Sequence, residues 1–257
     1  MPTDHQKPST ALFLFAHQDD EFGVFQQILN ERLAGRQVLC AYLTDGASAT
    51  VPASTRNEES LRVLGSLGIP PDGVIFAGEF LGIGDAKLPY HMLSVANWLQ
   101  DTLLAYPGID AIYFPAWEGG HHDHDALHAV AAHVSHQNGL GGSLRQFSLY
   151  NGKNCPGPFF SVLKPLPANG PSTKSVISMR NRLRFLRYCL AYPSQRVTWI
   201  GLLPFVLTHY LFKGLQELQA VSLQRLDERP HAGPLYYEKR KFFTWEQMQA
   251  ELARFRP

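Results

Sequence analysis

A histidine and three acidic residues follow directly after an apolar run near the start of the chain. The hexapeptide AHQDDE spans residues 16–21, and the run ALFLF precedes it. Charged side chains at the end of a buried strand are costly to remove from water, so we expect them to hold a ligand or take part in a reaction. His17 and Asp20 could supply two ligands to a zinc ion from one turn, because imidazole nitrogen and carboxylate oxygen both bind zinc.

A second cluster of the same chemistry, HHDHD, occupies residues 121–125. A catalytic zinc site typically has three protein ligands and keeps its fourth position for water, so this cluster could supply the third ligand. Spacing alone leaves several candidates for that ligand: His121, His122, His124, Asp125 and His128.

Both clusters also have simpler interpretations. Asp19 or Asp20 could cap a following helix, and Glu21 could complement its dipole. Asp123 or Asp125 could do the same for the helix after the second cluster, or HHDHD could be a surface tract that binds metal adventitiously. The metal-site hypothesis is favoured because both clusters follow predicted strands.

Hydrophobic runs alternate with amphipathic segments along the first half of the chain. The predicted strands are residues 11–16, 37–44, 74–78 and 109–116. The predicted helices are residues 22–35, 56–69, 91–106 and 125–138. This alternation predicts an α/β fold: a Rossmann-like, mostly parallel sheet with helices on both faces. Ligands of such sheets bind at the carboxyl ends of the strands, where AHQDDE, TDGAS and PAWEGGHHDH all fall.

The pattern loosens after about residue 140. We therefore predict a catalytic core at residues 1–150 and a helical and irregular C-terminal extension at 151–257, which packs on the core and sets substrate specificity. Within 180–212 an arginine-rich helix precedes an apolar run that is too short to span a bilayer. Peripheral membrane contact is one interpretation of this segment, and a core helix or dimer interface is the favoured one. The oligomeric state stays open.

The composition argues against several classes of function. The chain has 257 residues, 45% of them hydrophobic and 18% charged, which is typical of a globular protein. A net charge of +1 gives no support for binding nucleic acid through bulk electrostatics. Cys40, Cys155 and Cys189 are too scattered for a disulfide framework or a CxxC zinc site. The N-terminal apolar run is too short for a convincing signal peptide, so we expect a cytoplasmic protein.

The motifs, taken in order, resemble those of the PIG-L/LmbE-like zinc-dependent de-N-acetylases. AHQDDE resembles the (A/P)HPDDE motif of that family, and GHHDHDALH resembles its second motif, HPDH followed by a helix. LTDGASA followed by RNEE resembles the TxG segment and its RxxE helix, and LGIGDAKL resembles a glycine-rich loop that carries an aspartate. The similarity covers about residues 11–150. It departs from the family at Gln18 and His122, which stand where prolines are usual.

This resemblance implies a hydrolase that removes the acetyl group from an N-acetylglucosamine-type aminosugar in a small molecule or glycan precursor. It makes three residues the zinc ligands: His17, Asp20 and His124. Asp19 would be the general base that takes a proton from the zinc-bound water. Another divalent metal would also suit these ligands.

The same resemblance assigns roles around the metal. His121 would be the cationic or proton-donating histidine near the tetrahedral intermediate, and Asp123 would orient it. Arg56 would help to bind the substrate, and Asp85 would hydrogen-bond a sugar hydroxyl.

Three alternatives to this function remain. The same metal could serve hydrolysis of another acylamide or an ester, or the chain could be a non-catalytic module that binds metal or sugar. A nucleotide-binding Rossmann protein is disfavoured, because no GxGxxG follows the first strand and acidic residues there would repel a pyrophosphate.

Overall fold

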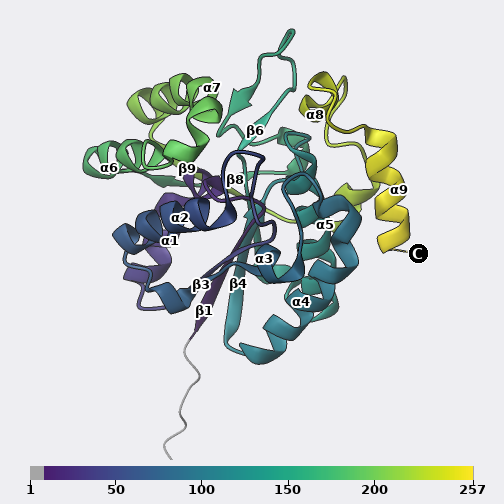
Figure 1. Cartoon of the computed structure of the whole chain (residues 1–257), viewed down its shortest axis with the longest axis horizontal. Coiled ribbons are helices and arrows are strands. Elements are labelled where there is room, and N and C mark those ends of the chain that lie inside the picture. The colour runs from purple at the N-terminus through teal and green to yellow at the C-terminus, as the bar shows by residue number, and fades with distance from the viewer. Residues whose placement is uncertain (1–8, 257) are drawn as a thin grey trace, which may run out of the picture.

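Five consecutive parallel strands form one side of a seven-stranded sheet in the computed structural model, which describes residues 9–256 (Figure 1). The strand order is β3-β2-β1-β4-β5-β9-β8, and β9 and β8 run antiparallel to their neighbours. The strands are β1 Thr10–Phe15, β2 Gln37–Tyr42, β3 Val74–Ile75, β4 Ile109–Pro115, β5 Leu144–Phe147, β8 Ser172–Val176 and β9 Leu215–Ala220. A separate small pair consists of β6 Tyr150–Asn151 and β7 Ser161–Val162. The predicted mostly parallel α/β sheet is confirmed.

Helices cover both faces of this sheet, as Figure 1 shows. They are α1 Phe25–Leu33, α2 Ala53–Leu67, α3 Ala77–Leu81, α4 Met92–Ala105, α5 His122–Gln137, α6 Met179–Cys189, α7 Arg196–Thr208, α8 Tyr236–Lys239 and α9 Trp245–Phe255. Successive side chains of a strand point to opposite faces, which divides β1 between two hydrophobic cores. Leu12 and Leu14 pack in the core that includes α4 and α5, whereas Phe13 and Phe15 pack in the core that includes α1 and α6. Because both faces are buried, β1 is a continuous apolar run.

The chain enters its first helix later than the periodicity predicts. Asp19 has a left-handed backbone with φ 99°, and a 3-10 turn, η1 (Asp20–Gly23), follows it. α1 begins only at Phe25, because Val24 is still non-helical with φ −145°. The acidic residues after β1 are therefore held in a tight turn and lie outside the helix.

The helix after the second cluster begins earlier than predicted. His121 has an extended backbone and caps α5, since its Nδ1 accepts a hydrogen bond from the Asp123 backbone N–H at 3.2 Å. His122 to Asp125 therefore form the first turn of α5, and their side chains point in different directions around the helix. The predicted strand at 74–78 is also shorter, because α3 begins at Ala77.

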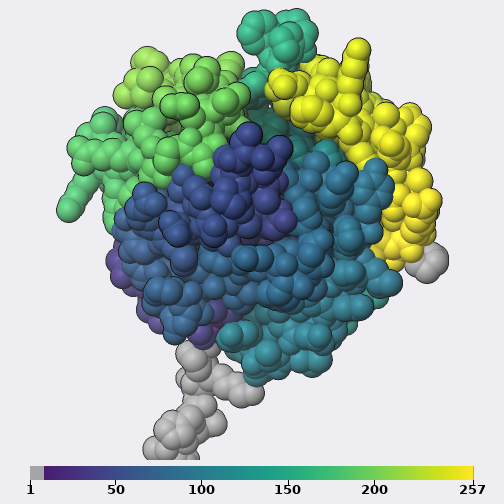
Figure 2. All heavy atoms as spheres, in the orientation of Figure 1, coloured from purple at the N-terminus to yellow at the C-terminus, as the bar shows by residue number. Residues whose placement is uncertain are grey.

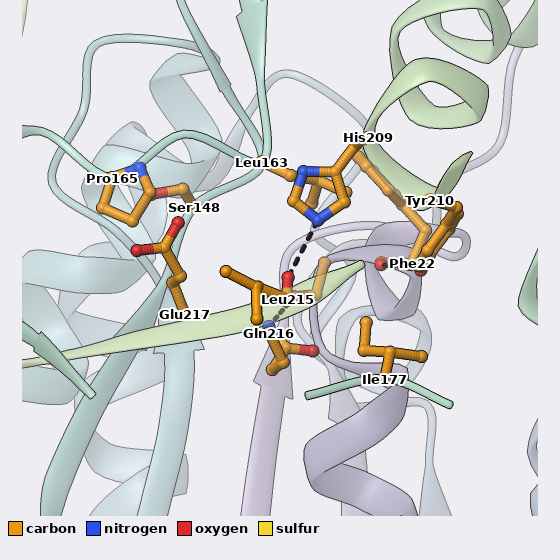
Figure 3. Close-up of a pocket in the computed structure, with 11 residues that line it drawn as sticks. Phe22, Ser148, Leu163, Pro165, Ile177, His209, Tyr210, Leu215, Gln216 and Glu217 are labelled. Atoms are coloured by element: carbon orange, nitrogen blue, oxygen red, sulfur yellow. Dashed lines mark hydrogen bonds between the residues drawn. The ribbon is translucent and has the colours of Figure 1, made fainter. Parts of the chain in front are cut away.

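The C-terminal part of the chain completes the sheet and contacts η1. The Gln216 side-chain amide donates to the Gly23 carbonyl at 2.7 Å, and the Tyr210 hydroxyl donates to the Phe22 carbonyl at 3.4 Å. Figure 3 shows Phe22, Tyr210 and Gln216 lining a cavity. The cavity has a volume of about 10 Å³, which is room for about one water molecule. A cavity of this size is too small for a substrate. The two hydrogen bonds therefore serve to hold η1 against the C-terminal part of the chain. The division of the chain at residue 150 remains a prediction.

The apolar run at 199–212 is buried on one face only. Trp199, Leu202 and Val206 of α7 lie in a hydrophobic core, while Ile200 and Phe205 are exposed. Among residues 9–256, no helix combines the length and the apolar character that crossing a bilayer requires. α7 is thus partly a core helix, and its outer face lacks a covering element among the described residues.

The close approach of α3 to the end of β2 gives a test of the packing. A Cβ added at Gly78 would overlap the backbone of Thr44, whereas one added at Gly84 would come no closer than 3.8 Å to any side chain, that of Lys87. We expect Gly78→Ala to lower the free energy of unfolding by about 1–3 kcal/mol. Gly84→Ala is the matched control and should change it by less than about 0.5 kcal/mol. Urea denaturation measures both, and equal effects would contradict the packing.

Candidate active site

A hydrogen bond between His17 and Asp123 joins the two clusters. His17 follows the end of β1, and its Nε2 lies 2.9 Å from Oδ2 of Asp123 in the first turn of α5. The Asp123 carboxylate also accepts the backbone N–H groups of Ala86 at 2.8 Å and Leu88 at 3.1 Å. Although burial alone would raise the pKa of Asp123, its hydrogen bond to His17 helps to hold it below the usual value. The ionised carboxylate only accepts, so Nε2 of His17 carries a hydrogen, and Nδ1 is the ring nitrogen through which His17 could bind a cation.

The other ring nitrogen of His17, Nδ1, faces Asp20. Oδ2 of Asp20 lies 3.7 Å from Nδ1 of His17, and Oδ1 of Asp20 lies 3.0 Å from Nε2 of His124. Burial would raise the pKa of Asp20, but His124 and His17 hold it well below the usual range. His17, Asp20 and His124 are all buried, and each offers a ligand atom within 4.8 Å of the others. Two imidazoles and one ionised carboxylate therefore converge on one point, which is a donor set that suits a divalent cation.

Asp19 lies beside this set in a strained conformation. A left-handed backbone at a residue other than glycine costs about 1–3 kcal/mol and persists only where its surroundings hold it. The Asp19 backbone N–H donates to Oε2 of Glu21 at 2.8 Å, and the Tyr42 hydroxyl donates to Oε1 of the same carboxylate. Burial raises the pKa of Asp19 to about 8, even though Arg56 opposes the shift. A carboxyl with this pKa can exchange a proton near neutral pH.

Arg56 is buried and connects the loop after β2 with the acidic residues. Its guanidinium donates to the carbonyls of Gln18 and Gly46, at 2.6 Å each. It lies 3.7 Å from Oδ1 of Asp19 and 3.5 Å from Oδ2 of Asp85. The Asp85 side chain is 37% exposed, and His17 and Arg56 hold its pKa below the usual range although burial opposes them. Asp85 is therefore an ionised acceptor at the open side of the site.

His121 lies at the entrance of the same site. Its ring centroid is 4.7 Å from that of His17, and burial together with the neighbouring His17 lowers its pKa well below the usual value. Its Nδ1 accepts the Asp123 backbone N–H, so the hydrogen of the neutral ring is on Nε2. Asp123, expected to orient His121, lies 3.9 Å from it and hydrogen-bonds His17 instead.

The other candidate ligands of the second cluster point elsewhere. Nε2 of His122 lies 3.2 Å from the Ala86 carbonyl, and its ring stacks on Phe243. His128 contacts the Pro115 carbonyl through Nδ1 at 2.9 Å. Asp125 accepts the backbone N–H groups of Glu118 and Gly119. Of the alternatives that spacing left open, only His124 faces both His17 and Asp20.

A second set of side chains that could hold a metal overlaps the first. It consists of His17, Asp85, His121 and Asp123. In this set Asp123 already accepts two backbone N–H groups and the His17 ring. Its lone pairs are largely committed, so the set that contains Asp20 and His124 is the better cation site.

The motifs did not predict the contacts of three residues at the site: Glu21, Glu118 and Tyr150. Glu21 is fully buried, and its carboxylate accepts a hydrogen bond from the Asp19 backbone N–H. We had expected Glu21 to complement the dipole of the following helix. Glu118, inside PAWEGG, accepts the backbone N–H groups of Leu149 and Tyr150, at 2.6 and 3.0 Å. Tyr150 thereby packs edge-on against His124, with ring centroids 5.7 Å apart. The only feature of the sequence that pointed to the contacts of Tyr150 was the acidic Glu118 at the end of a predicted strand.

These side chains line one cavity of about 120 Å³. Its polar wall comes from the two clusters and the loops between them, and its other wall comes from the C-terminal part of the chain. The residues are His17, Asp19, Asp20, Phe22, Arg56, Asp85, His121, Tyr150, Gln195, Thr198 and Leu202. The site thus combines a donor set that could hold a cation, a carboxyl of raised pKa and room for a small group.

Known proteins share this fold and part of this sequence. Residues 12–135 match the family PIG-L: GlcNAc-PI de-N-acetylase. Among solved structures, the A40926 pseudoaglycone deacetylase has a TM-score of 0.63 at 15% identity and covers 88% of this chain and 100% of its own. The zinc-inhibited form of teicoplanin deacetylase has a TM-score of 0.59 at 15% identity, over 75% of this chain and 87% of its own.

N,N'-diacetylchitobiose deacetylase from Pyrococcus horikoshii, solved with its inhibitor MPG, has a TM-score of 0.60 at 16% identity. The match covers 88% of each chain. At these identities the similarity shows a common fold. No curated protein sequence matches the chain.

The carboxylate that holds Asp19 gives a prediction for stability. Glu21→Ala would leave the Asp19 N–H and the Tyr42 hydroxyl without an acceptor in a buried site. We expect it to lower the free energy of unfolding by about 2–4 kcal/mol. Glu21→Gln keeps a carbonyl for Asp19 and an amide that can donate to Tyr42, so its loss should be less than half as large. Urea denaturation at neutral pH compares them, and an equal loss for both variants would contradict this role.

Proposed function

Because residues 12–135 match the PIG-L family, we propose that the protein is a zinc-dependent N-deacetylase of an N-acetylglucosamine-type aminosugar. The observation that carries the proposal is the convergence of His17, Asp20 and His124 beside Asp19. Amide hydrolysis needs a polarised carbonyl and a base for the attacking water, and this constellation offers both. The deacetylase relatives of similar fold support the same reaction class.

We infer that His17, Asp20 and His124 hold a divalent cation, zinc or a metal of similar ligand preference. Such a cation supplies polarisation of the amide carbonyl and lowers the pKa of a nearby water molecule. The hydrogen bond from His17 to Asp123 fixes the tautomer in which Nδ1 is free to bind. Asp123 therefore acts on the metal site by orienting His17.

In the proposed reaction Asp19 takes a proton from the attacking water. Its raised pKa lets the carboxyl keep that proton and deliver it to the departing amine nitrogen, so the products are acetate and the free aminosugar. His121 is a neutral ring with its hydrogen on Nε2, and we assign it as a hydrogen-bond donor to the oxygen that becomes negative.

Asp85 and Arg56 complete the proposed substrate site. The partly exposed, ionised Asp85 is suited to accept a hydrogen bond from a sugar hydroxyl. The Arg56 guanidinium is committed to two carbonyls and two carboxylates, so we propose that it binds substrate mainly by positioning Asp19 and Asp85. Residues 151–257 contribute Thr198 and Leu202 to the cavity wall and are proposed to set specificity.

Two substitutions separate metal binding from proton transfer. Asp19→Asn removes the base but none of the proposed ligands, so it should keep zinc and lower the rate of acetate release by about 10²–10⁴-fold. His17→Ala should lose both zinc and activity. Zinc content after dialysis and acetate release from N-acetylglucosamine derivatives are the two measurements.

His136→Ala is the control for these variants, because His136 is an exposed histidine of α5 that should affect neither measurement. An Asp19→Asn variant with wild-type acetate release would defeat the proposed mechanism. A His17→Ala variant that binds zinc normally would defeat the proposed ligand set.

A further inference from the structure

The outer sides of α6 and α7 form a surface that is both apolar and basic, and we propose that it docks on an anionic lipid bilayer. This corner surface consists of the exposed side chains of residues 179–213. The two helices contact each other and bury their inner residues in one hydrophobic core. They lie together at one corner of the molecule, on the side away from α8 and α9 (Figure 2).

The first component of the corner surface is an apolar stripe along α7 and the π-helical turn η7 (His209–Lys213) that continues it. Ile200, Leu207 and Leu211 follow one another at intervals of seven and four residues, which places them on one side of a helix. They are 72%, 40% and 46% exposed, and Phe212 beside them is 81% exposed. A single exposed apolar residue is ordinary, but a continuous stripe of them marks an interaction surface.

The second component is positive charge without negative charge. Residues 126–216 contain ten of the 23 Lys and Arg residues of the chain and none of its 22 Asp and Glu residues. This segment therefore has a net charge of +10, whereas the whole chain has +1. Its exposed basic residues on the corner surface are Arg180, Arg187, Arg196 and Lys213. Within the described part of the chain, none of these four pairs with a carboxylate.

The two components are interleaved on α6. Leu183 and Leu190 are 54% and 64% exposed, and Arg187 lies between them, one helical turn from each. Helices that lie in a membrane interface have this composition, because their apolar side chains enter the acyl boundary while Lys and Arg contact anionic headgroups. α7 has 13 residues, which is too short to cross a bilayer but sufficient to lie along its surface.

Two other partners fit the corner surface less well. A second copy in a two-fold dimer would place the same face against itself, so Arg180 and Arg187 would face like charges with no carboxylate to pair with. Nucleic acid would suit the arginines but not the apolar stripe, because proteins contact it mainly at phosphate and sugar. An anionic bilayer offers both negative headgroups and an apolar layer beneath them.

Flotation with lipid vesicles tests the proposal on the full chain. Wild-type protein should float with phosphatidylcholine vesicles that contain about one third phosphatidylglycerol, and not with vesicles of phosphatidylcholine alone. Raising the NaCl concentration from about 0.1 M to about 0.5 M should weaken this binding, because salt screens the arginines from the headgroups. Failure to float with the anionic vesicles, or equal flotation with both kinds, would overturn the proposal.

Two double variants test the two components separately. Ile200→Gln combined with Leu211→Gln removes apolar contacts, and Arg180→Gln combined with Arg187→Gln removes two charges. Each should lower the partition coefficient onto the anionic vesicles by about tenfold or more. All four side chains point away from the core, so the urea midpoint should stay close to that of the wild type.

Matched controls carry the same changes elsewhere on the molecule. Leu93→Gln combined with Leu104→Gln alters two leucines of α4 that are 66% and 68% exposed. Lys241→Gln combined with Arg254→Gln removes two exposed charges on the side of α8 and α9. Both controls should bind the anionic vesicles within about twofold of the wild type. Equal losses in variants and controls, or wild-type binding by either corner variant, would overturn the proposal.

Sedimentation equilibrium without lipid separates docking from self-association. The wild type and the Ile200→Gln, Leu211→Gln variant should have the same mass. A larger mass for the wild type that this variant abolishes would assign the corner surface to a second copy and overturn the proposal. None of these measurements uses turnover, so their outcome is independent of the proposed reaction.

Discussion

The hydrogen bond between His17 and Asp123 is the contact on which the rest of the site depends. It joins the end of β1 to the first turn of α5 and occupies Nε2 of His17, so Nδ1 is the ring nitrogen that faces Asp20. Several carboxylates are buried around it, and burying charge is favourable only where each group is paired or hydrogen-bonded. Backbone N–H groups, histidines and Arg56 provide those partners. The sheet brings these partners together, because its parallel strands end at one edge.

Much of this arrangement follows from the sequence, and the remainder depends on local geometry. The apolar runs of β1, β2 and β4 predicted the parallel sheet, and the position of both clusters after strands predicted their proximity. Spacing could not select His124 among the histidines, because the direction of each ring depends on where α5 begins. That start is set by the His121 cap, a contact within the cluster itself. The role of Glu21 was hidden for a similar reason, since only the left-handed turn at Asp19 brings its carboxylate back to the preceding N–H.

The C-terminal part was harder to interpret because its helices are only half buried. α7 packs one apolar face in the core and leaves other apolar side chains exposed, so its sequence has no clear amphipathic pattern. The same helix lines the pocket that contains His17, Asp19 and Asp20. The proposed catalytic residues thus follow the parallel strands, while α7 contributes to the shape of the pocket.

The position of a bound metal tests this view of the site most directly. A crystal structure of the zinc-loaded protein, with anomalous scattering measured at the zinc edge, would locate the ion without relying on turnover. We predict one zinc ion held by His17 through Nδ1, by the Asp20 carboxylate and by His124, with Asp19 next to it but not bound. A zinc ion held instead by His17, Asp85, His121 and Asp123, or no ordered zinc at either set, would contradict it.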